Sequence, residues 1–169
     1  PVKSIEAPGT RDENGPQGLT ASLLGSGATQ LTATAFTSED VMAATFNTDL
    51  MTAVGTIIGN NCLSANIACL YGPGNNIHRT PYGGRNFEYF SEDPYIAGAM
   101  GAAWVQGAQE SGAGTSLKHF AANNQEHRRH FVESVVSERA LREIYLRGFE
   151  IAVKEGHARS IMTSYNPLN

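Results

Sequence analysis

The chain has 169 residues, of which 41% are hydrophobic and 17% are charged, and its formal net charge at pH 7 is −4. This composition is typical of a globular protein, and the acidic balance argues against a nucleic-acid partner, which needs clustered Lys and Arg. A membrane partner is not expected either, because no run of about 20 apolar residues is present, and two cysteines are too few for a disulfide framework.

The two ends of the sequence look cut rather than natural, and it starts without an initiator Met or a signal peptide. We therefore expect the chain to be part of a longer protein, whose localisation and oligomeric state the sequence leaves open. Its length fits one ordinary domain or a piece of a larger one.

The first predicted helix covers residues 37–59. Ser38 is a suitable N-cap, and acidic residues in the first turn would interact favourably with the helix dipole. Positions expected to face the core recur at roughly helical spacing, namely Val41, Ala44, Thr45, Leu50, Val54, Ile57 and Ile58. A short buried strand, NIACLYG, is predicted next at residues 66–72.

A long loop rich in Gly, Pro and Asn separates this strand from the second predicted helix. Asp93 followed by Pro94 is a favourable helix start, with Asp at the N-cap and Pro at the first helical position. The helix is predicted to run to Ser111 and to end at Gly112. The segment TSLKHF, residues 115–120, is predicted to be the next strand.

The clearest helix in the sequence covers residues 137–156, from Ser137 as N-cap to Gly156. Its predicted buried stripe consists of Leu141, Ile144, Tyr145, Phe149 and Ala152. On the outer side, Glu138–Arg142 and Glu143–Arg147 are spaced as i,i+4 ion pairs. The last predicted strand is SIMTSYN, residues 160–166.

Strands that alternate with helices predict βαβ units and a parallel sheet, so the fold class is α/β. Two architectures fit, namely an open doubly wound sheet and a (β/α)8 barrel. Because a complete barrel typically needs about 250 residues, this chain could form only part of one.

Polar residues gather where the predicted strands end. They are Arg79 and Arg85 after the first strand, Lys118, His119 and Arg129 after the second, and Tyr165 and Asn166 after the third. Both architectures carry their active sites at the carboxyl ends of parallel strands. The sequence therefore predicts a functional site at this end of the sheet.

Several kinds of site lack the motif they need. The GPGNNIHR segment has no GK[ST] of a phosphate-binding loop, no GxGxxG opens a helix, no HExxH or Cys/His spacing indicates a metal, and no GxSxG indicates a serine hydrolase. Clustered cations, amides and aromatic residues suit a sugar, because its hydroxyls both donate and accept hydrogen bonds. The same residues also fit a structural ion pair between Arg85 and Glu88, with Lys118 paired to a neighbouring carboxylate.

Four segments in order resemble glycoside hydrolase family 3, in its bacterial β-glucosidase form: GPGNNIHRTPYGGRNFEYFSEDPY, KHFAANNQE, SERALREIYLRGFEIAVKEG and SIMTSYNPLN. The resemblance runs from about Glu13 to the last residue, and the KHFPGHG-type loop of the β-N-acetylglucosaminidase branch is absent. It implies that residues 1–169 are part of one (β/α)8 domain, with no second domain within the chain. It also implies retaining hydrolysis of terminal non-reducing β-D-glucosyl residues.

The resemblance assigns roles to particular residues. Arg85, Lys118 and His119 would bind sugar hydroxyls, and His119, lying among cations, would be neutral. Arg129 would order the pocket, and Met162 and Tyr165 would line it. The KHF stretch would have unusual backbone geometry. A β-glucoside or cello-oligosaccharide would be the substrate, the remaining domains of the same enzyme would be partners, and no metal or other cofactor would be needed.

One position departs from the family pattern. The first sugar-binding aspartate of the family lies in a DGP motif, and Asn14 stands in its place in ENGPQGL. An amide keeps an acceptor oxygen but loses the charge, so it binds a hydroxyl less strongly. Asp12, two residues upstream, is a candidate to compensate by supplying the lost charge.

No catalytic residue is expected within the chain. The resemblance puts the nucleophilic aspartate in an SDW-like motif after SYN and the acid/base glutamate elsewhere in the protein. Glu88 and Glu126 match structural carboxylates of the family. Two other hypotheses remain, namely a non-catalytic fragment or inactive sugar-binding relative, and a Rossmann-like nucleotide binder.

Overall fold

The computed structural model describes residues 3–5, 9–20 and 31–169. In this part of the chain the strands β1 (Asp12–Asn14), β2 (Cys69–Tyr71), β3 (Gly114–Phe120) and β4 (Ser160–Thr163) form one parallel sheet in the order β1-β2-β3-β4. The predicted parallel α/β arrangement is therefore confirmed.

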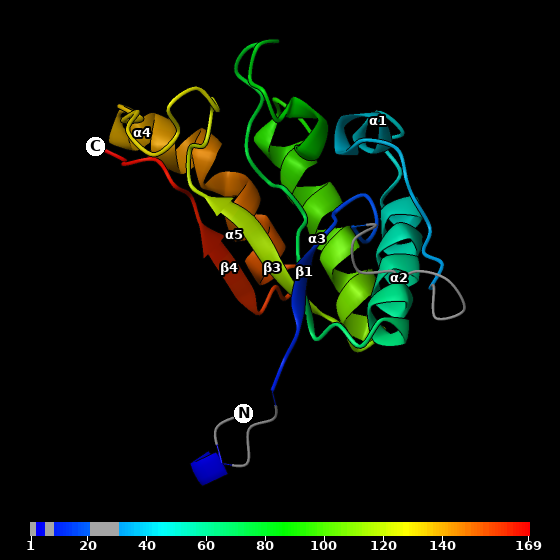
Figure 1. The fold of residues 1–169 in the computed structure, drawn as a ribbon. Coiled ribbons are helices and arrows are strands. Elements are labelled where there is room, and N and C mark those ends of the chain that lie inside the picture. Colours follow the sequence, from blue (N-terminus) through cyan, green and yellow to red (C-terminus); the bar gives the residue numbers. More distant parts are fainter. Residues whose placement is uncertain (1–2, 6–8, 21–30) are drawn as a thin grey trace.

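The three long connecting helices are α2 (Thr48–Ser64), α3 (Pro94–Glu110) and α5 (Arg147–Lys154). They lie side by side on one face of the sheet, with α3 packed between α2 and α5 (Figure 1). Helices on one face of a parallel sheet are typical of a (β/α)8 barrel, whereas a doubly wound sheet carries helices on both faces. None of the helices in the described residues is long and apolar enough to span a membrane.

The predicted helix over residues 37–59 was wrong in two respects, because it is two helices and the second continues to Ser64. Helix α1 covers Glu39–Ala43, and α2 begins at Thr48. Phe46 has a φ of 52°, which ends regular right-handed helix. Asn47 then caps α2, since its Oδ1 accepts from the Leu50 amide at 3.0 Å. Ser38 occupies the N-cap position of α1 without a side-chain capping bond.

This break changes which positions face the core. Of the predicted positions, Val54 and Ile58 are buried, whereas Val41, Leu50 and Ile57 are exposed. The buried residues of α2 follow a 3.6-residue period that starts at the new N-cap: Met51, Val54, Gly55, Ile58, Gly59 and Cys62.

Helices α2 and α3 approach each other closely through glycines. A Cβ atom at Gly107 would overlap the carbonyl oxygen of Thr52, and one at Gly55 would overlap that of Trp104. The approach packs Trp104, which is fully buried, into the core between the helices and the sheet. Part of the high glycine content therefore serves helix packing.

The start of α3 agrees with the prediction. The Oδ1 atom of Asp93 accepts from the amides of Tyr95 at 2.7 Å and Ile96 at 3.0 Å, and Pro94 is the first helical residue. The chain leaves the helix at Gly112, whose φ of 100° favours glycine.

The predicted helix over residues 137–156 is helical, but a π turn interrupts it. It consists of α4 (Glu138–Ala140), η5 (Leu141–Tyr145) and α5. Ser137 caps it as predicted, accepting from the Ala140 amide at 3.3 Å. Tyr145, Phe149 and Ala152 of the predicted stripe are buried, and Leu141 and Ile144 are partly buried.

The π turn also changes one of the two predicted ion pairs. Glu138–Arg142 forms, at 3.0 Å. Glu143 instead pairs with Arg139, at 3.0 Å, and Arg147 pairs with Glu150. A π turn contains more residues than an α turn, so positions on either side of it lose their i,i+4 alignment.

Replacing Gly107 by Ala tests the close approach of α2 and α3. We expect Gly107→Ala to lower the free energy of unfolding by about 1–3 kcal/mol, because the added methyl group must push the helices apart. Chemical denaturation of the purified protein measures this change. Asn60→Ala, at an exposed position of α2, is the control and should stay within about 0.5 kcal/mol of the wild type. Equal stability of the Gly107→Ala variant would contradict the packing described.

Candidate functional site

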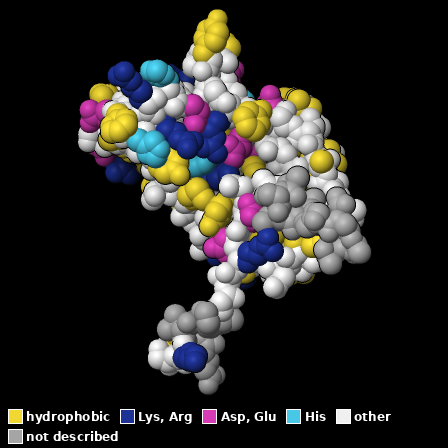
Figure 2. Space-filling view, in the orientation of Figure 1, with side chains coloured by type: hydrophobic (Ala, Val, Ile, Leu, Met, Phe, Trp, Pro, Cys, Tyr) yellow, Lys and Arg dark blue, Asp and Glu magenta, His cyan; other side chains and the backbone are white. Residues whose placement is uncertain are grey.

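A cavity of about 490 Å³ opens at the carboxyl ends of the strands. Its lining residues are Asn14, Tyr71, Arg85, His119, Arg129, Met162, Thr163 and Tyr165. Cationic, acidic and His side chains crowd together just beyond the ends of β3 and β4 (Figure 2). The family resemblance gave substrate-binding roles to seven residues, and six of them line this one cavity. The seventh, Lys118, contacts the cavity through Asn14.

A buried carboxylate joins the two principal cations of the site. Glu88 belongs to the short 3-10 helix η4 (Asn86–Glu88). One of its oxygens, Oε1, lies 2.6 Å from Nζ of Lys118, and the other, Oε2, accepts from Nε of Arg85 at 2.6 Å. Lys118 is only 1% exposed and Glu88 6%. The ion pairs that the sequence allowed are thus both present, and they share one carboxylate.

Arg85 is held from two sides. Its guanidinium contacts Glu88, and its Nη1 lies 3.8 Å from Oε1 of Glu126. Burial alone would lower the pKa of Arg85, but the nearby Glu88 carboxylate and its hydrogen bond outweigh this, so that the pKa is raised above its ordinary value. The cation is therefore fixed in both charge and position.

Lys118 has a second, weaker partner. Its Nζ donates to Oδ1 of Asn14 at 3.3 Å, across the sheet from β3 to β1. A carboxylate at this position would add a charged acceptor and an ion pair, whereas the amide supplies only a neutral acceptor. The predicted compensation by Asp12 gains no support, since Asp12 is not among the residues that line the cavity.

Asn76 fixes the backbone of His119. Its Oδ1 accepts from the His119 amide at 2.7 Å, and its Nδ2 donates to the His119 carbonyl at 2.8 Å. The peptide bonds Lys118–His119 and Phe120–Ala121 are cis, in agreement with the unusual backbone expected of the KHF stretch.

The His119 ring is neutral and has a defined hydrogen-bond partner. Its Nδ1 lies 3.3 Å from the hydroxyl of Tyr89, which accepts from Nδ2 of Asn123 at 2.8 Å. If the Tyr89 hydroxyl donates to Nδ1, the ring proton of His119 lies on Nε2. Burial first, and then the charges of Arg85, Lys118 and Arg129, lower the pKa of His119 to about 3. The expectation of a neutral imidazole among cations agrees with this value.

Glu126 organises the opposite side of the cavity. Its Oε2 lies 2.8 Å from Nη1 of Arg129, and its Oε1 accepts from Nδ2 of Asn123 at 3.1 Å. The Arg129 guanidinium stacks 4.6 Å from the ring centroid of Tyr165. This cation–π contact holds both side chains at the cavity wall.

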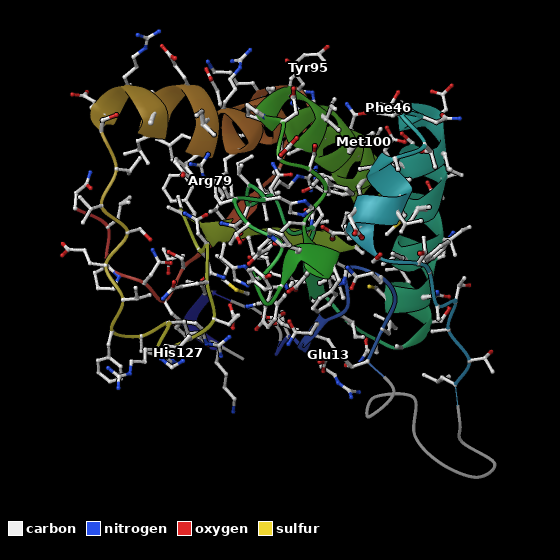
Figure 3. All side chains as sticks on the ribbon, turned by 90° about the horizontal axis from the view of Figure 1, so that it is seen from above. Glu13, Phe46, Arg79, Tyr95, Met100 and His127 are labelled. Atoms are coloured by element: carbon white, nitrogen blue, oxygen red, sulfur yellow. The ribbon has the colours of Figure 1, made fainter. Side chains whose placement is uncertain are left out.

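Two other polar residues near the predicted strand ends lie elsewhere. Arg79 stacks over the ring of Tyr145, at 5.7 Å from its centroid, and does not line the cavity. Figure 3, a view from above, labels Arg79 well away from His127. Asn166 donates to the carbonyl oxygen of Ala121 at 3.2 Å, beside a separate, smaller cavity.

Sequence reasoning missed several residues of the site. Tyr71 and Thr163 line the cavity and are the last residues of β2 and β4, which are shorter than the predicted strands at residues 66–72 and 160–166. Asn76, Tyr89 and Asn123 carry no such signal, because their roles depend on contacts between distant segments.

The chemistry of this arrangement is binding rather than bond cleavage. The cavity wall has cationic, hydroxyl, amide and imidazole groups, and the carboxylates of Glu88 and Glu126 are each engaged by cations. No group of three or more His, Cys, Asp or Glu in the described residues could hold a metal ion. Groups of this kind are suited to binding several hydroxyls in one orientation.

The sheet, its helices and this cavity define part of a (β/α)8 barrel with a cavity at the carboxyl ends of its strands, where such barrels carry their sites. The family model described as "Glycosyl hydrolase family 3 N terminal domain" matches residues 19–169. The chain belongs to glycoside hydrolase family 3.

Relatives agree in sequence and in structure. A beta-glucosidase of Ruminococcus albus is 56% identical over 129 residues, which are 76% of this chain and 14% of that protein. An exo-alpha-(1->6)-L-arabinopyranosidase of Bifidobacterium breve is 46% identical over 99% of this chain and 23% of that protein. The structure of beta-glucosidase 3B from Thermotoga neapolitana in complex with glucose matches all of this chain and 24% of its own, with a TM-score of 0.94 and 45% identity. The chain thus spans less than a quarter of the length of each of these relatives.

The low pKa of His119 makes the stability of the fold depend on pH. Unfolding returns the pKa from about 3 to the ordinary value of 6.5, so the unfolded chain binds more protons between these values. The contribution of His119 to stability is therefore present above pH 6.5 and is lost as the pH falls towards 3.

We expect the His119→Asn variant to lose less stability than the wild type as the pH falls. Between pH 6 and 4 the free energy of unfolding of the wild type should fall more steeply than that of the variant, by up to about 1 kcal/mol per pH unit. Urea denaturation at several pH values measures both curves. His157→Asn is the control, since His157 is exposed, and it should follow the wild type. Parallel curves for the wild type and His119→Asn would contradict a buried neutral imidazole.

Proposed function

We propose that this chain forms the sugar-binding part of the catalytic domain of a retaining β-glucosidase, which hydrolyses terminal non-reducing β-D-glucosyl residues of β-glucosides or cello-oligosaccharides. One observation carries the proposal, namely the cavity at the strand ends lined by hydrogen-bonding groups that Glu88 and Glu126 hold in place. The similarity to a structure in complex with glucose supports a glucoside as ligand.

Each residue has a distinct task in this proposal. Lys118 and Arg85 keep N–H donors beyond those bound by Glu88, and these donors bind sugar hydroxyls. His119 donates from Nε2 while Tyr89 holds its other nitrogen. Charged hydrogen bonds of this kind contribute on the order of 1.5–3 kcal/mol each when desolvated. Met162 and Tyr165 supply the apolar wall against which the sugar ring packs.

The bond-breaking groups belong to the rest of the enzyme in this proposal. Retaining hydrolysis needs two carboxylates about 5–5.5 Å apart, one as nucleophile and one as acid/base. Glu88 and Glu126 are already bound to Lys118, Arg85 and Arg129, which restricts their freedom to reach a substrate. The two carboxylates suffice for the reaction, so it involves no metal or other cofactor.

Asn14 favours a second candidate function, a sugar-binding relative without hydrolytic activity. An amide holds Lys118 where a carboxylate would bind more strongly. The intact protein distinguishes the two functions, because a non-catalytic relative binds a glucose-mimicking inhibitor but does not cleave an aryl β-glucoside. An aryl α-L-arabinopyranoside should be assayed beside it, given the relative from Bifidobacterium breve.

Removing Lys118 tests the binding role. In the intact enzyme, Lys118→Ala should lower kcat/KM for an aryl β-glucoside by a factor of about 100 or more, because a charged donor is lost and Glu88 is left partly unpaired. Lys154→Ala is the matched control, since Lys154 is an exposed lysine on α5, and it should leave kcat/KM unchanged. If Lys118→Ala and Arg85→Ala both retain the wild-type value, these residues do not bind the substrate.

Restoring a carboxylate at position 14 tests the role of the amide. Asn14→Asp should raise kcat/KM by about tenfold, because a charged acceptor replaces a neutral one in the hydrogen bond to Lys118 or to a sugar hydroxyl. Asp12→Asn should have no effect if Asp12 does not compensate. Steady-state kinetics on the same substrate measures both, and a fall in kcat/KM for Asn14→Asp would contradict the role given to Asn14.

A further inference from the structure

A glutamate outside the cavity is buried beneath the Lys118–Glu88 ion pair. Glu39 is the first residue of α1, a position at which an acidic side chain is ordinarily solvated, yet its exposed fraction is 0%. Its Oε1 accepts from the amide of Gly74 at 3.2 Å, and its Oε2 has no hydrogen-bond partner within the described part of the chain. Burying a carboxyl is costly unless its oxygens are hydrogen-bonded, so Glu39 is retained here at an energetic cost.

Gly74 connects this carboxyl to the backbone of Lys118. The segment around Gly74 pairs with β3 on both sides of the lysine: the Lys118 amide donates to the carbonyl of Pro73 at 3.1 Å, and the Asn75 amide donates to the carbonyl of Lys118 at 2.6 Å. The backbone from which the Lys118 side chain extends is therefore held by the segment that Glu39 holds.

Gly74 also touches the residue that binds the Lys118 ammonium. A Cβ atom at Gly74 would overlap the carbonyl oxygen of Glu88, so the backbones of the two residues are in direct contact. Helix α1 packs on η4, which carries Glu88. Glu39 thus supports both partners of the ion pair through the same amide.

The protonation state of Glu39 fits this position. Burial, together with the charge of Glu88, raises the pKa of Glu39 well above its ordinary value, although the Gly74 bond and Lys118 act in the opposite direction. A protonated carboxyl keeps an acceptor oxygen for Gly74 and avoids competing with Glu88 for the lysine.

We propose that Glu39 is a positioning residue, whose carboxyl holds the Gly74 amide and thereby fixes Lys118 and Glu88 in the arrangement that binds the ligand. The inference rests on the proposed function in that Lys118 binds the sugar. Glu39 itself touches no substrate, and it acts only through the backbone at Gly74.

Three variants of the intact enzyme separate this role from simple core packing. Glu39→Gln keeps the size and the acceptor oxygen, whereas Glu39→Met keeps the size and removes the acceptor. Met42→Ala removes buried apolar volume from the same helix, where Met42 is 3% exposed, and keeps the carboxyl that accepts from the Gly74 amide. The measurements are KM and kcat on an aryl β-glucoside, the Kd of a glucose-mimicking inhibitor, and hydrogen–deuterium exchange of residues 72–78 and 114–121.

The expected results differ between the variants. Glu39→Met should raise KM and the inhibitor Kd by about tenfold, because an amide in the support of Lys118 is left unpaired, and it should speed exchange in both segments. Glu39→Gln should stay within about threefold of the wild type in KM and Kd. Met42→Ala should lower the thermal midpoint but leave KM and exchange near Lys118 unchanged.

Several outcomes would overturn the inference: a Glu39→Met variant with wild-type KM and exchange, a Glu39→Gln variant as impaired as Glu39→Met, or a Met42→Ala variant with the same rise in KM. The exchange measurement does not depend on catalysis. If the wild-type enzyme cleaves no glycoside, the proposed function fails while exchange near Lys118 still tests the role of Glu39.

Discussion

The site depends on one buried carboxylate, Glu88, which binds Lys118 and Arg85 together. Burying either cation alone would be unfavourable, because a buried charge without a partner costs several kcal/mol. By sharing Glu88, the two cations are held in fixed positions and still have N–H donors left for a ligand. The same positive charges, together with burial, keep His119 neutral. The composition of the cavity wall therefore follows from a single ion cluster.

The fold brings the members of this cluster together from distant segments. Lys118 is in β3, Asn14 is in β1, and Glu88 lies in the long loop after β2. Parallel strands bring their carboxyl ends to one edge of the sheet, which is why side chains more than 100 residues apart can bond there, as Lys118 and Asn14 do. Helices α2 and α3 cover one face of the sheet and approach each other closely at glycines. They give the strand ends a rigid support.

Much of this arrangement could be predicted from sequence, and the failures have physical causes. Alternation of strands and helices, and the caps at Asp93 and Ser137, depend on local chemistry that neighbouring residues determine. The break before α2 depends on a left-handed residue, Phe46, which is not a residue that usually adopts this conformation.

A helix irregularity and a packing contact were also missed from the sequence. The predicted Glu143–Arg147 pair fails because a π turn shifts the helix phase, and sequence gives no sign of such a turn. Glu39 looks like an ordinary acidic residue of a first helical turn, and only the packing of α1 on η4 buries it. Six of the predicted site residues do line the cavity, since their positions follow from strand ends.

The most direct test of the central claim is a crystal structure of the intact enzyme with bound glucose. We expect sugar hydroxyls within hydrogen-bonding distance of Nζ of Lys118, the Arg85 guanidinium and Nε2 of His119, while Glu88 still bridges the two cations. A sugar bound elsewhere, or one in this cavity that touches none of these three groups, would contradict it.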